Sequence, residues 1–406
     1  MPTASSFAIA GCVAWTPIEY ISNVLILVDR GVVSYAGPAG SIPLPLGAEV
    51  FDFGGKLICP GFIDLQVNGL GGSAVMAGEA DAVVSIAREL ARRGTSGFLP
   101  TLTTESGDKL LASALAVRRA WEILEKENFP AASILGIHLE GPFISPKMAG
   151  AHPAEHIRPI DLEEIVCIAD AAGGWGAEGR PGLVLATLSP ELDGAAKAAG
   201  WFRRRGVVPA MGHTAAKDEE VERFISAGAS FAVHAYNRYG APEEEGSPET
   251  GLPYHRAPGP MAAVASDPRL MVGLIADGVH VHPGIVSGFL QGSGWARTAL
   301  TSDLVSDRGL SGREEGRVSG PAVRSGGVLT GSRLSIGEMV PLLKKWCPLD
   351  NGRILATASW NPARLLGLEG KWGCIRTKAR ADFCILDPES LEMSAAMVAG
   401  EWAVGP

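Results

Sequence analysis

The sequence of 406 residues lacks three features that would each point to a particular class of protein. It contains no CxxC pair, and its six cysteines are scattered, which is typical of reduced thiols in a cytoplasmic protein. It has no uninterrupted apolar run of about 18 residues, so we expect no membrane span. No positive charge precedes the first apolar run, so we expect no signal peptide.

An excess of basic residues is also missing. The formal net charge is −9 and the isoelectric point is about 5.5, whereas a protein that binds nucleic acid needs a basic face for the phosphate backbone. We therefore expect no nucleic-acid partner, although a small phosphorylated substrate needs only one or two local cations. With 46% hydrophobic and 19% charged residues, the composition indicates a globular chain with a large core.

Short apolar runs alternate with helical patterns through the middle of the chain. Two helices are predicted at 81–94 and 108–128, and two more at 335–346 and 352–366. Eight candidate strands are predicted at 62–67, 97–102, 133–140, 183–189, 207–213, 231–236, 271–277 and 298–303. Eight strands that alternate with helices predict an α/β fold, a closed (β/α)8 TIM-type barrel.

The two ends of the chain have a different pattern of short alternating runs. We predict that residues 1–59 and 371–406 jointly form a small β-sandwich domain beside a barrel of residues 60–370. A turn at Asp29–Gly31 predicts a hairpin in the first part. Residues 238–260 form a long loop rich in Pro, Gly and Glu, and a loop of this length at a barrel mouth is more often functional than decorative.

Histidines and acids follow several of the predicted strands. A single histidine at a strand end is more often a satisfied polar residue than a ligand, but the carboxyl ends of barrel strands face one mouth. A buried carboxylate there needs a partner, and two histidines with one glutamate form a known catalytic zinc arrangement. We therefore expect Glu140, His213 and His234 to bind one metal ion, with Asp303 across the mouth, free to take and return a proton.

The first predicted strand lies in PGFIDLQVNG, residues 60–69. Many barrel hydrolases carry two metal-binding histidines, one residue apart, at the end of such a strand. Here the two positions are Gln66 and Asn68, which are poor ligands for a divalent transition metal. We expect a mononuclear site on other strands, with these two amides lining it.

Seven motifs carry a family resemblance because they occur together and in a fixed order: PGFIDLQVNGLGG, GIHLEGPFIS, AMGHTAA, HAYN, LIADGVHVHP, LTSD and WNPARLLGL. From about residue 50 to its end, the chain resembles the N-acetylglucosamine-6-phosphate deacetylases of the amidohydrolase superfamily. The resemblance implies a hydrolase that converts N-acetylglucosamine 6-phosphate into glucosamine 6-phosphate and acetate. It implies a homodimer and one divalent ion, which we expect to be zinc, with iron, manganese or cobalt as alternatives.

The resemblance also implies roles for individual residues. It gives the metal-ligand role to Glu140, His213 and His234, and the general acid/base role to Asp303. It places His152 near the scissile amide of the substrate. The remaining implied contacts are to the phosphate or sugar: Asn237, His280 and, from a neighbouring subunit, Arg256.

The sequence departs from the family near the sugar-phosphate end. Arg238 stands where the family usually has a small residue, and the loop that follows is longer and contains Glu243, Glu244 and Glu245. Arg238 is therefore an alternative or additional phosphate ligand. The alternatives for function are deacetylation of a related amino sugar, phosphorylated or not, another barrel amidohydrolase activity, and a non-catalytic sugar-phosphate sensor. His138 is expected to be structural, and no role is expected for His156, His255 and His282.

Overall fold

The barrel is built from strands that are buried along almost their whole length. The computed structural model describes residues 6–126, 129–176, 181–240, 244–245, 255–256, 259–292, 294–307, 309–310, 317–325 and 327–406. The eight barrel strands are β8 (Phe62–Val67), β11 (Thr95–Thr103), β13 (Ile137–Glu140), β14 (Leu183–Leu188), β15 (Val208–Met211), β16 (Phe231–Ala232), β19 (Met271–Leu274) and β20 (Thr298–Leu300). A two-residue strand, β12 (Ser133–Ile134), also pairs with β11.

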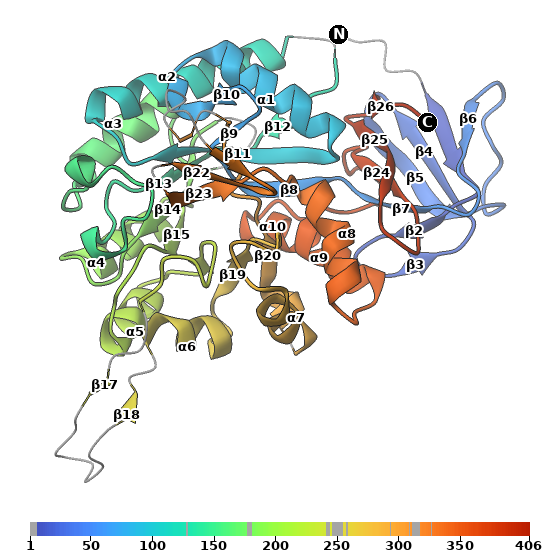
Figure 1. The fold of residues 1–406 in the computed structure, drawn as a ribbon. Coiled ribbons are helices and arrows are strands. Elements are labelled where there is room, and N and C mark those ends of the chain that lie inside the picture. The colour runs from blue at the N-terminus through green and yellow to red at the C-terminus, as the bar shows by residue number, and fades with distance from the viewer. Residues whose placement is uncertain are drawn as a thin grey trace.

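These strands pair in parallel and in chain order, with β8 beside β11. The last strand returns to the first, because Val67 forms a parallel bridge with Leu304 and the Asn68 N–H donates to the Leu304 carbonyl at 2.8 Å. The predicted (β/α)8 barrel is thus confirmed (Figure 1). Each predicted strand overlaps an observed one; the bounds of 62–67 are identical, whereas most of the later predictions extend past the observed carboxyl end.

Helices surround this sheet. In α1 (Ala80–Arg92) the buried positions Val83, Ala87 and Leu90 follow the helical period, so one face packs on the barrel. The other helices between the strands are α2 (Gly107–Leu124), α3 (Leu162–Ala172), α4 (Ala195–Arg203), α5 (Asp218–Ser226), α6 (Gly259–Ser266) and α7 (Pro283–Gln291). The predictions at 81–94 and 108–128 are confirmed, with α2 ending at Leu124.

The helix predicted at 335–346 is α8 (Ile336–Trp346). The single helix predicted at 352–366 is wrong, because two helices occupy this range: α9 (Asn351–Ala358) and α10 (Trp360–Leu365). Between them Ser359 leaves the helical conformation, with φ −134° and ψ −63°. Pro362 explains the break, since it has no N–H for the carbonyl four residues earlier and its ring clashes with that carbonyl.

The two ends of the chain form a separate pair of sheets. In one sheet, β7 (Leu57–Pro60) pairs antiparallel with β24 (Phe383–Leu386). The order across this sheet is β26 (Glu401–Val404), β25 (Met393–Val398), β24, β7, β2 (Val13–Trp15) and β3 (Tyr20–Ile21). The second sheet has the order β5 (Val32–Pro38), β4 (Val24–Asp29), β1 (Phe7–Ala10) and β6 (Glu49–Asp52).

Apolar side chains from both sheets fill the space between them, including Ile9, Ile26, Ile58, Phe383 and Met397. Figure 1 shows the blue amino-terminal and red carboxyl-terminal strands side by side at one end of the barrel. The small β-domain built by both termini is therefore confirmed, while its boundaries at residues 59 and 371 stay a prediction. Its hairpin turns through Arg30 and Gly31, both with positive φ, as a two-residue turn between twisted strands requires.

One part of the fold was not predicted. After β20 the chain forms an antiparallel sheet of β21 (Arg317–Ser319), β22 (Ala322–Ser325) and β23 (Val328–Ser332). Leu304, which follows the eighth barrel strand, bridges to Ser332 in this sheet, so the sheet is joined to the carboxyl end of the barrel. In the predicted loop 238–260, a strand pair formed by β17 (Glu244–Glu245) and β18 (His255–Arg256) is described. Residues 241–243, 246–254 and 257–258 of the loop lie outside the described residues.

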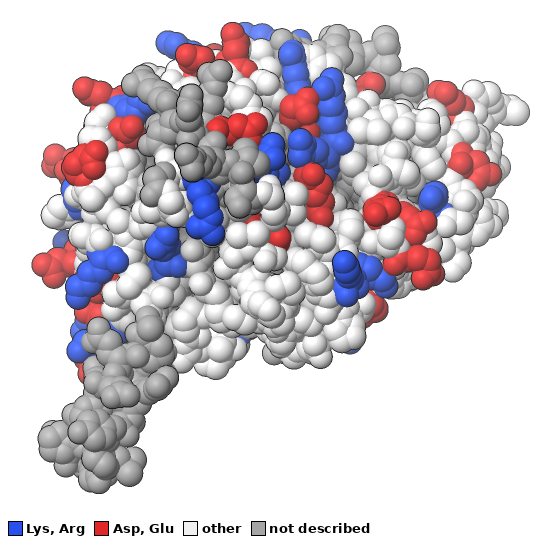
Figure 2. All heavy atoms as spheres, viewed as in Figure 1, with Lys and Arg blue, Asp and Glu red and all other residues white. Residues whose placement is uncertain are grey.

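On the viewed face, Lys and Arg side chains lie among Asp and Glu side chains (Figure 2). Arg269 illustrates the local pairing, since it contacts both Asp267 and Glu222. Among the described residues, no helix has the length and apolar character needed to cross a membrane.

A buried carboxylate helps to close the barrel. Asp64 Oδ1 accepts from the backbone N–H groups of Gln66 and Ser302, both at 3.2 Å, and so links the first strand to the chain after the eighth. Its Oδ2 is buried without a partner. Burial raises the pKa of Asp64 to about 7, because the charged form loses its hydration.

We predict that Asp64→Asn changes the pH dependence of stability. Between the ordinary Asp pKa of about 4 and the folded value of about 7, the native wild type holds a proton that the unfolded chain has released. The contribution of the Asp64 carboxyl to the free energy of unfolding is therefore present at low pH and is lost as the pH rises through about 7. The melting temperature of wild type should fall relative to that of the variant between pH 5 and pH 8.

Asp193→Asn, at an exposed position, is the matched control. Its melting temperature should depend on pH in the same way as that of wild type. Parallel pH profiles for wild type and Asp64→Asn would contradict the raised pKa.

Candidate metal centre and active site

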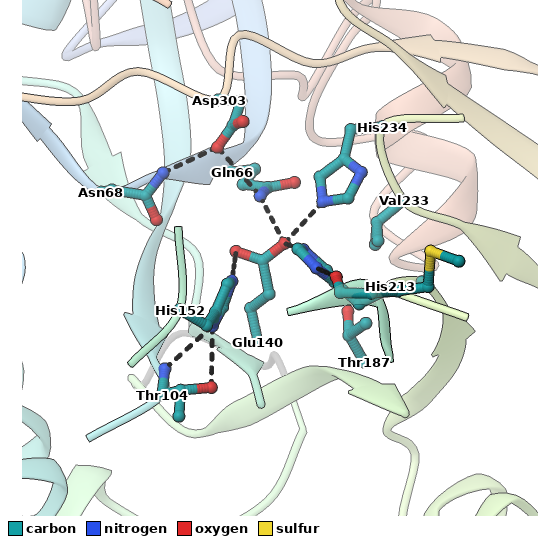
Figure 3. Close-up of polar contacts among 12 residues, drawn as sticks. Gln66, Asn68, Thr104, Glu140, His152, Thr187, His213, Val233, His234 and Asp303 are labelled. Carbon is teal, nitrogen blue, oxygen red and sulfur yellow. Dashed lines mark hydrogen bonds and ion pairs between the residues drawn. The ribbon is translucent and has the colours of Figure 1, made fainter. Parts of the chain in front are cut away.

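Polar residues from five barrel strands meet at the carboxyl end of the barrel. Gln66 lies in β8 and Asn68 follows it, whereas Glu140 is the last residue of β13. The other three each follow a strand by two or three residues: His213 after β15, His234 after β16 and Asp303 after β20. Figure 3 shows these side chains pointing toward one another, so the predicted convergence occurs.

Three of these residues adopt a backbone conformation that is rare for residues other than glycine. His213 has φ 47°, His234 has φ 27° and Asp303 has φ 51°. Such conformations cost about 1–3 kcal/mol each and persist only where the surrounding structure enforces them. Their concentration at one barrel mouth marks a functional site independently of the side-chain chemistry.

The Glu140 carboxylate is the centre of the cluster. Its Oε1 lies 2.8 Å from His234 Nε2 and 3.5 Å from His213 Nε2. The Gln66 Nε2 group donates to the same oxygen at 2.8 Å. Two imidazole nitrogens from separate strands are thus aimed at a single carboxylate oxygen.

The charge state of the cluster follows from these contacts. Burial alone would raise the pKa of Glu140, but its contacts with the His213 and His234 rings outweigh burial and hold this pKa well below its ordinary value. Burial alone would lower the pKa of His234, but its hydrogen bond to Glu140 raises this pKa above the ordinary value. The 2.8 Å contact between His234 and Glu140 contributes to both shifts, and a metal cation bound there would compete with protons for the same nitrogen.

The two amides of the first strand hold both carboxylates. Gln66 Nε2 donates to Glu140 Oε1 and, at 3.0 Å, to Asp303 Oδ1. Asn68 Nδ2 donates to the same Asp303 oxygen at 2.8 Å. The side-chain oxygens of Gln66 and Asn68 are buried without a partner. Both amides therefore contact carboxylates of the cluster, and their role toward a substrate stays a prediction.

Asp303 differs from Glu140 although the two share the Gln66 amide. Burial, and then repulsion by Glu140, raise the pKa of Asp303 to about 7. The nearby imidazoles and the Asn68 amide oppose this shift without cancelling it. A carboxylate with a pKa near neutrality can both accept and return a proton.

His213 and His152 present different ring nitrogens to the site. His213 Nδ1 lies 2.8 Å from the Met148 carbonyl oxygen, which can only accept, so Nδ1 carries the proton and Nε2 carries a lone pair. His152 Nδ1 accepts from the Thr104 N–H at 3.4 Å, so its proton is on Nε2. Burial, and then His213, lower the pKa of His152 to about 3, which keeps its ring neutral. His213 thus offers a ligand nitrogen, and His152 offers an N–H donor.

The donor set fits a divalent metal ion. In the described part of the chain, Glu140, His152 and His213 each place a possible ligand atom within 4.8 Å of the others. We favour His234 as the third ligand because its Nε2 lies 2.8 Å from Glu140 Oε1, whereas His152 Nε2 lies 4.0 Å from Glu140 Oε2. Two imidazoles and a carboxylate with an open fourth position match the ligand sets of catalytic zinc sites.

Two adjoining hollows open beside this cluster. The first, of about 300 Å³, is lined by Glu140, Asp303, Asn237 and Arg238, together with the three histidines of the cluster. The second, of about 620 Å³, is lined on one side by Thr103, Thr104 and Glu105. Ala151, Leu310 and Thr330 line both, and Thr330 lies in β23, so the unpredicted sheet contributes a wall of the site.

His280 lies deep in the structure and is oriented by Asp277. Its Nδ1 is 2.7 Å from Asp277 Oδ2, and its Nε2 is buried without a partner. Arg256 lies in β18, but its side chain is outside the described part of the structure, so its role stays a prediction.

His138 is structural, as expected. Its ring nitrogens contact the Leu65 carbonyl at 3.2 Å and Thr187 Oγ1 at 2.8 Å, which links β13 to β8 and to β14. Sequence reasoning missed Thr104, Met148 and Asp277. Only Asp277 carried a visible signal, since it is an acid at the end of a predicted strand.

Comparisons with known proteins agree with this geometry. The model of the amidohydrolase family matches residues 57–403. The N-acetylgalactosamine-6-phosphate deacetylase of Escherichia coli O157:H7 is 32% identical over 350 residues, which cover 84% of this chain and 87% of that protein. The human N-acetylglucosamine-6-phosphate deacetylase is 31% identical over 375 residues, with 86% and 84% covered.

A solved structure is also similar over almost the whole chain. It is a variant of the N-acetyl-D-glucosamine-6-phosphate deacetylase of Mycobacterium smegmatis in complex with N-acetyl-D-glucosamine-6-phosphate, with a TM-score of 0.82 and 28% identity. The similarity covers 99% of this chain and 100% of that chain. The chain therefore belongs to the amidohydrolase family and, within it, to the N-acetylglucosamine-6-phosphate deacetylase family.

Proposed function

We propose that this protein hydrolyses the acetamide of N-acetylglucosamine 6-phosphate to give glucosamine 6-phosphate and acetate. The observation that carries the proposal is the convergence of two imidazoles on Glu140 Oε1, with Asp303 held beside it by the shared Gln66 amide. The names of the similar proteins support the same reaction.

Glu140, His213 and His234 would hold one divalent ion, and these three ligands suit zinc. Iron, manganese and cobalt accept similar donors and remain alternatives. When bound, the ion supplies Lewis acidity, which polarises a carbonyl group and makes water more acidic. Hydrolysis of an amide needs both effects near neutral pH.

The remaining residues move protons and stabilise charge. Asp303 accepts a proton from the attacking water and returns it to the leaving amine, for which a pKa near 7 is suitable. His152 donates from Nε2 to the acetamide oxygen, where negative charge develops as the carbonyl is attacked. Thr104 keeps the His152 ring in the tautomer that can donate.

Substrate contacts are assigned to residues around the same mouth. Asn237 lines the first hollow, and we assign it to the phosphate end of the substrate. His280, oriented by Asp277, would contact the sugar or phosphate through Nε2, and the free amide oxygens of Gln66 and Asn68 would accept from the substrate. Arg256 would reach the phosphate of a neighbouring subunit, so the homodimer stays a prediction, as does the cytoplasmic location.

N-acetylgalactosamine 6-phosphate is the second candidate substrate, because the similar Escherichia coli protein is named for it. The two sugars carry the same acetamide and the same phosphate and differ only in the configuration of one hydroxyl group. A purely sugar-binding role is less well supported, because a sensor has no use for a carboxylate with a pKa near neutrality beside the ligand set.

We predict that the purified protein contains one divalent ion per chain and releases acetate from N-acetylglucosamine 6-phosphate. The assay panel should include N-acetylgalactosamine 6-phosphate and both unphosphorylated sugars. Removal of the ion with a chelator should abolish turnover, and addition of zinc should restore it. Absence of acetate release from every sugar in the metal-loaded protein would refute the proposal.

The Asp303→Asn variant should retain its metal and lose about two to four orders of magnitude in kcat, the usual contribution of general acid–base catalysis. Metal content by elemental analysis and kcat from acetate release are the measurements. Asn retains an oxygen that accepts from Gln66 and Asn68, so the fold should be preserved. Turnover within threefold of wild type would remove Asp303 from this role.

His152→Gln and His213→Gln should separate the donor from the ligand. Because His213 offers a lone pair and His152 an N–H, the His213 variant should lose most of its metal. The His152 variant should keep its metal and show a lower kcat. Equal loss of metal in both variants would place His152 among the ligands instead.

A further inference from the structure

We propose that Arg238 binds the anionic group of the substrate from within the same chain and so determines specificity for phosphorylated sugars. This inference rests on the proposed function. It differs from the expected role of Arg256, which would reach the phosphate of a neighbouring subunit. If Arg238 provides the cation, each chain carries a complete substrate site.

Arg238 is the only Lys or Arg among the described residues that line either hollow. It is half-buried, and within the described ranges its guanidinium has no carboxylate partner. An unpaired cation at the wall of a polar site is costly unless a ligand supplies the opposite charge. A phosphate group suits Arg particularly well, because the planar guanidinium can donate two parallel hydrogen bonds to it.

The backbone holds Arg238 firmly in this position. Its carbonyl accepts from the Thr214 N–H at 3.1 Å, and the Gly240 N–H donates to the Thr214 carbonyl at 2.7 Å. The neighbouring Tyr239 hydroxyl lies 2.9 Å from the carbonyl oxygens of Met211 and Val233. Arg238 itself has φ 58°, a strained value for a large side chain that the surrounding bonds maintain.

A glycine makes room for the guanidinium. A Cβ added at Gly150 would lie 2.8 Å from Arg238 Nε and 3.2 Å from its Cδ. Gly150 belongs to the same loop as Ala151 and His152, which line the first hollow. The Arg238 side chain therefore lies along this loop, on the wall of the hollow that also contains the metal cluster.

The distribution of charge around the two hollows orients the bound substrate. Glu140 and Asp303 occupy the catalytic end of the first hollow, and Glu105, which pairs with His156 at 3.4 Å, lies on the second. Glu105 repels an anionic group from the second hollow, and apart from the ion that Glu140 would hold, Arg238 is the cation among the described lining residues that attracts it. The acetamide then faces Asp303, while the phosphate lies beside Arg238 and the neighbouring Asn237 amide.

The test compares binding of glucosamine 6-phosphate and of glucosamine by calorimetry, because binding does not require turnover. Arg238→Ala should weaken binding of the phosphorylated ligand about 10- to 100-fold, the range for loss of a charged hydrogen bond. Arg238→Lys should recover part of the lost affinity, since lysine keeps the positive charge but cannot donate two parallel hydrogen bonds as the guanidinium does. Arg30→Ala, at an exposed position far from both hollows, is the control and should bind like wild type.

Steady-state kinetics with N-acetylglucosamine 6-phosphate should agree, with the effect of Arg238→Ala mainly on KM. An equal loss for phosphorylated and unphosphorylated ligands, or no loss for either, would overturn the inference. If wild type binds glucosamine 6-phosphate through Arg238 but releases no acetate, the proposed function fails while the inference stands. If Arg256→Ala weakened binding of glucosamine 6-phosphate more than Arg238→Ala does, the cation would come from the neighbouring subunit and the inference would be overturned.

Discussion

The buried carboxylate of Glu140 is the constraint on which the rest of the barrel mouth depends. It is 2% exposed, and an isolated ionised carboxylate at such a position costs several kcal/mol. Imidazole nitrogens from the ends of β15 and β16 and an amide from β8 offset this cost by converging on one oxygen. The strained backbone at His213 and His234 follows from the same requirement, because each ring must turn inward at the point where its strand ends.

Two carboxylates lie within reach of the same Gln66 amide, yet their pKa values are displaced in opposite directions. Glu140 is surrounded by imidazoles, so its charge is compensated and it remains ionised. Asp303 accepts only from amides and is repelled by Glu140, so its proton is held more tightly. This separation gives one acid the character of a permanent ligand and the other the character of a proton carrier.

The barrel and most of the site could be predicted from the sequence because both depend on local patterns. The strand at 62–67 is an apolar run between Pro-Gly and Asn-Gly, and its observed bounds are identical. The ligand histidines follow strands whose carboxyl ends must meet in any such barrel. The break at Ser359 was missed although Pro362 gave a visible signal. The sheet at 317–332 was missed because its apolar runs are short and interrupted by glycine.

The sequence did not predict which ring nitrogen of each histidine carries the proton. His213 and His152 are both buried, and their ring centres are 4.5 Å apart, yet one offers a lone pair and the other a proton. The Thr104 hydroxyl lies 2.7 Å from His152 Nδ1, but the difference between the two rings follows from two main-chain groups: the Met148 carbonyl, which can only accept, and the Thr104 N–H, which can only donate. Every residue has a main-chain carbonyl, and every residue except proline has an N–H, so residue identity alone does not encode these contacts. They depend on the path of the loop after β13, which brings the Met148 carbonyl to His213 and also carries His152. The choice of His213 over His152 as a proposed metal ligand therefore depends on this loop path as much as on the histidines themselves.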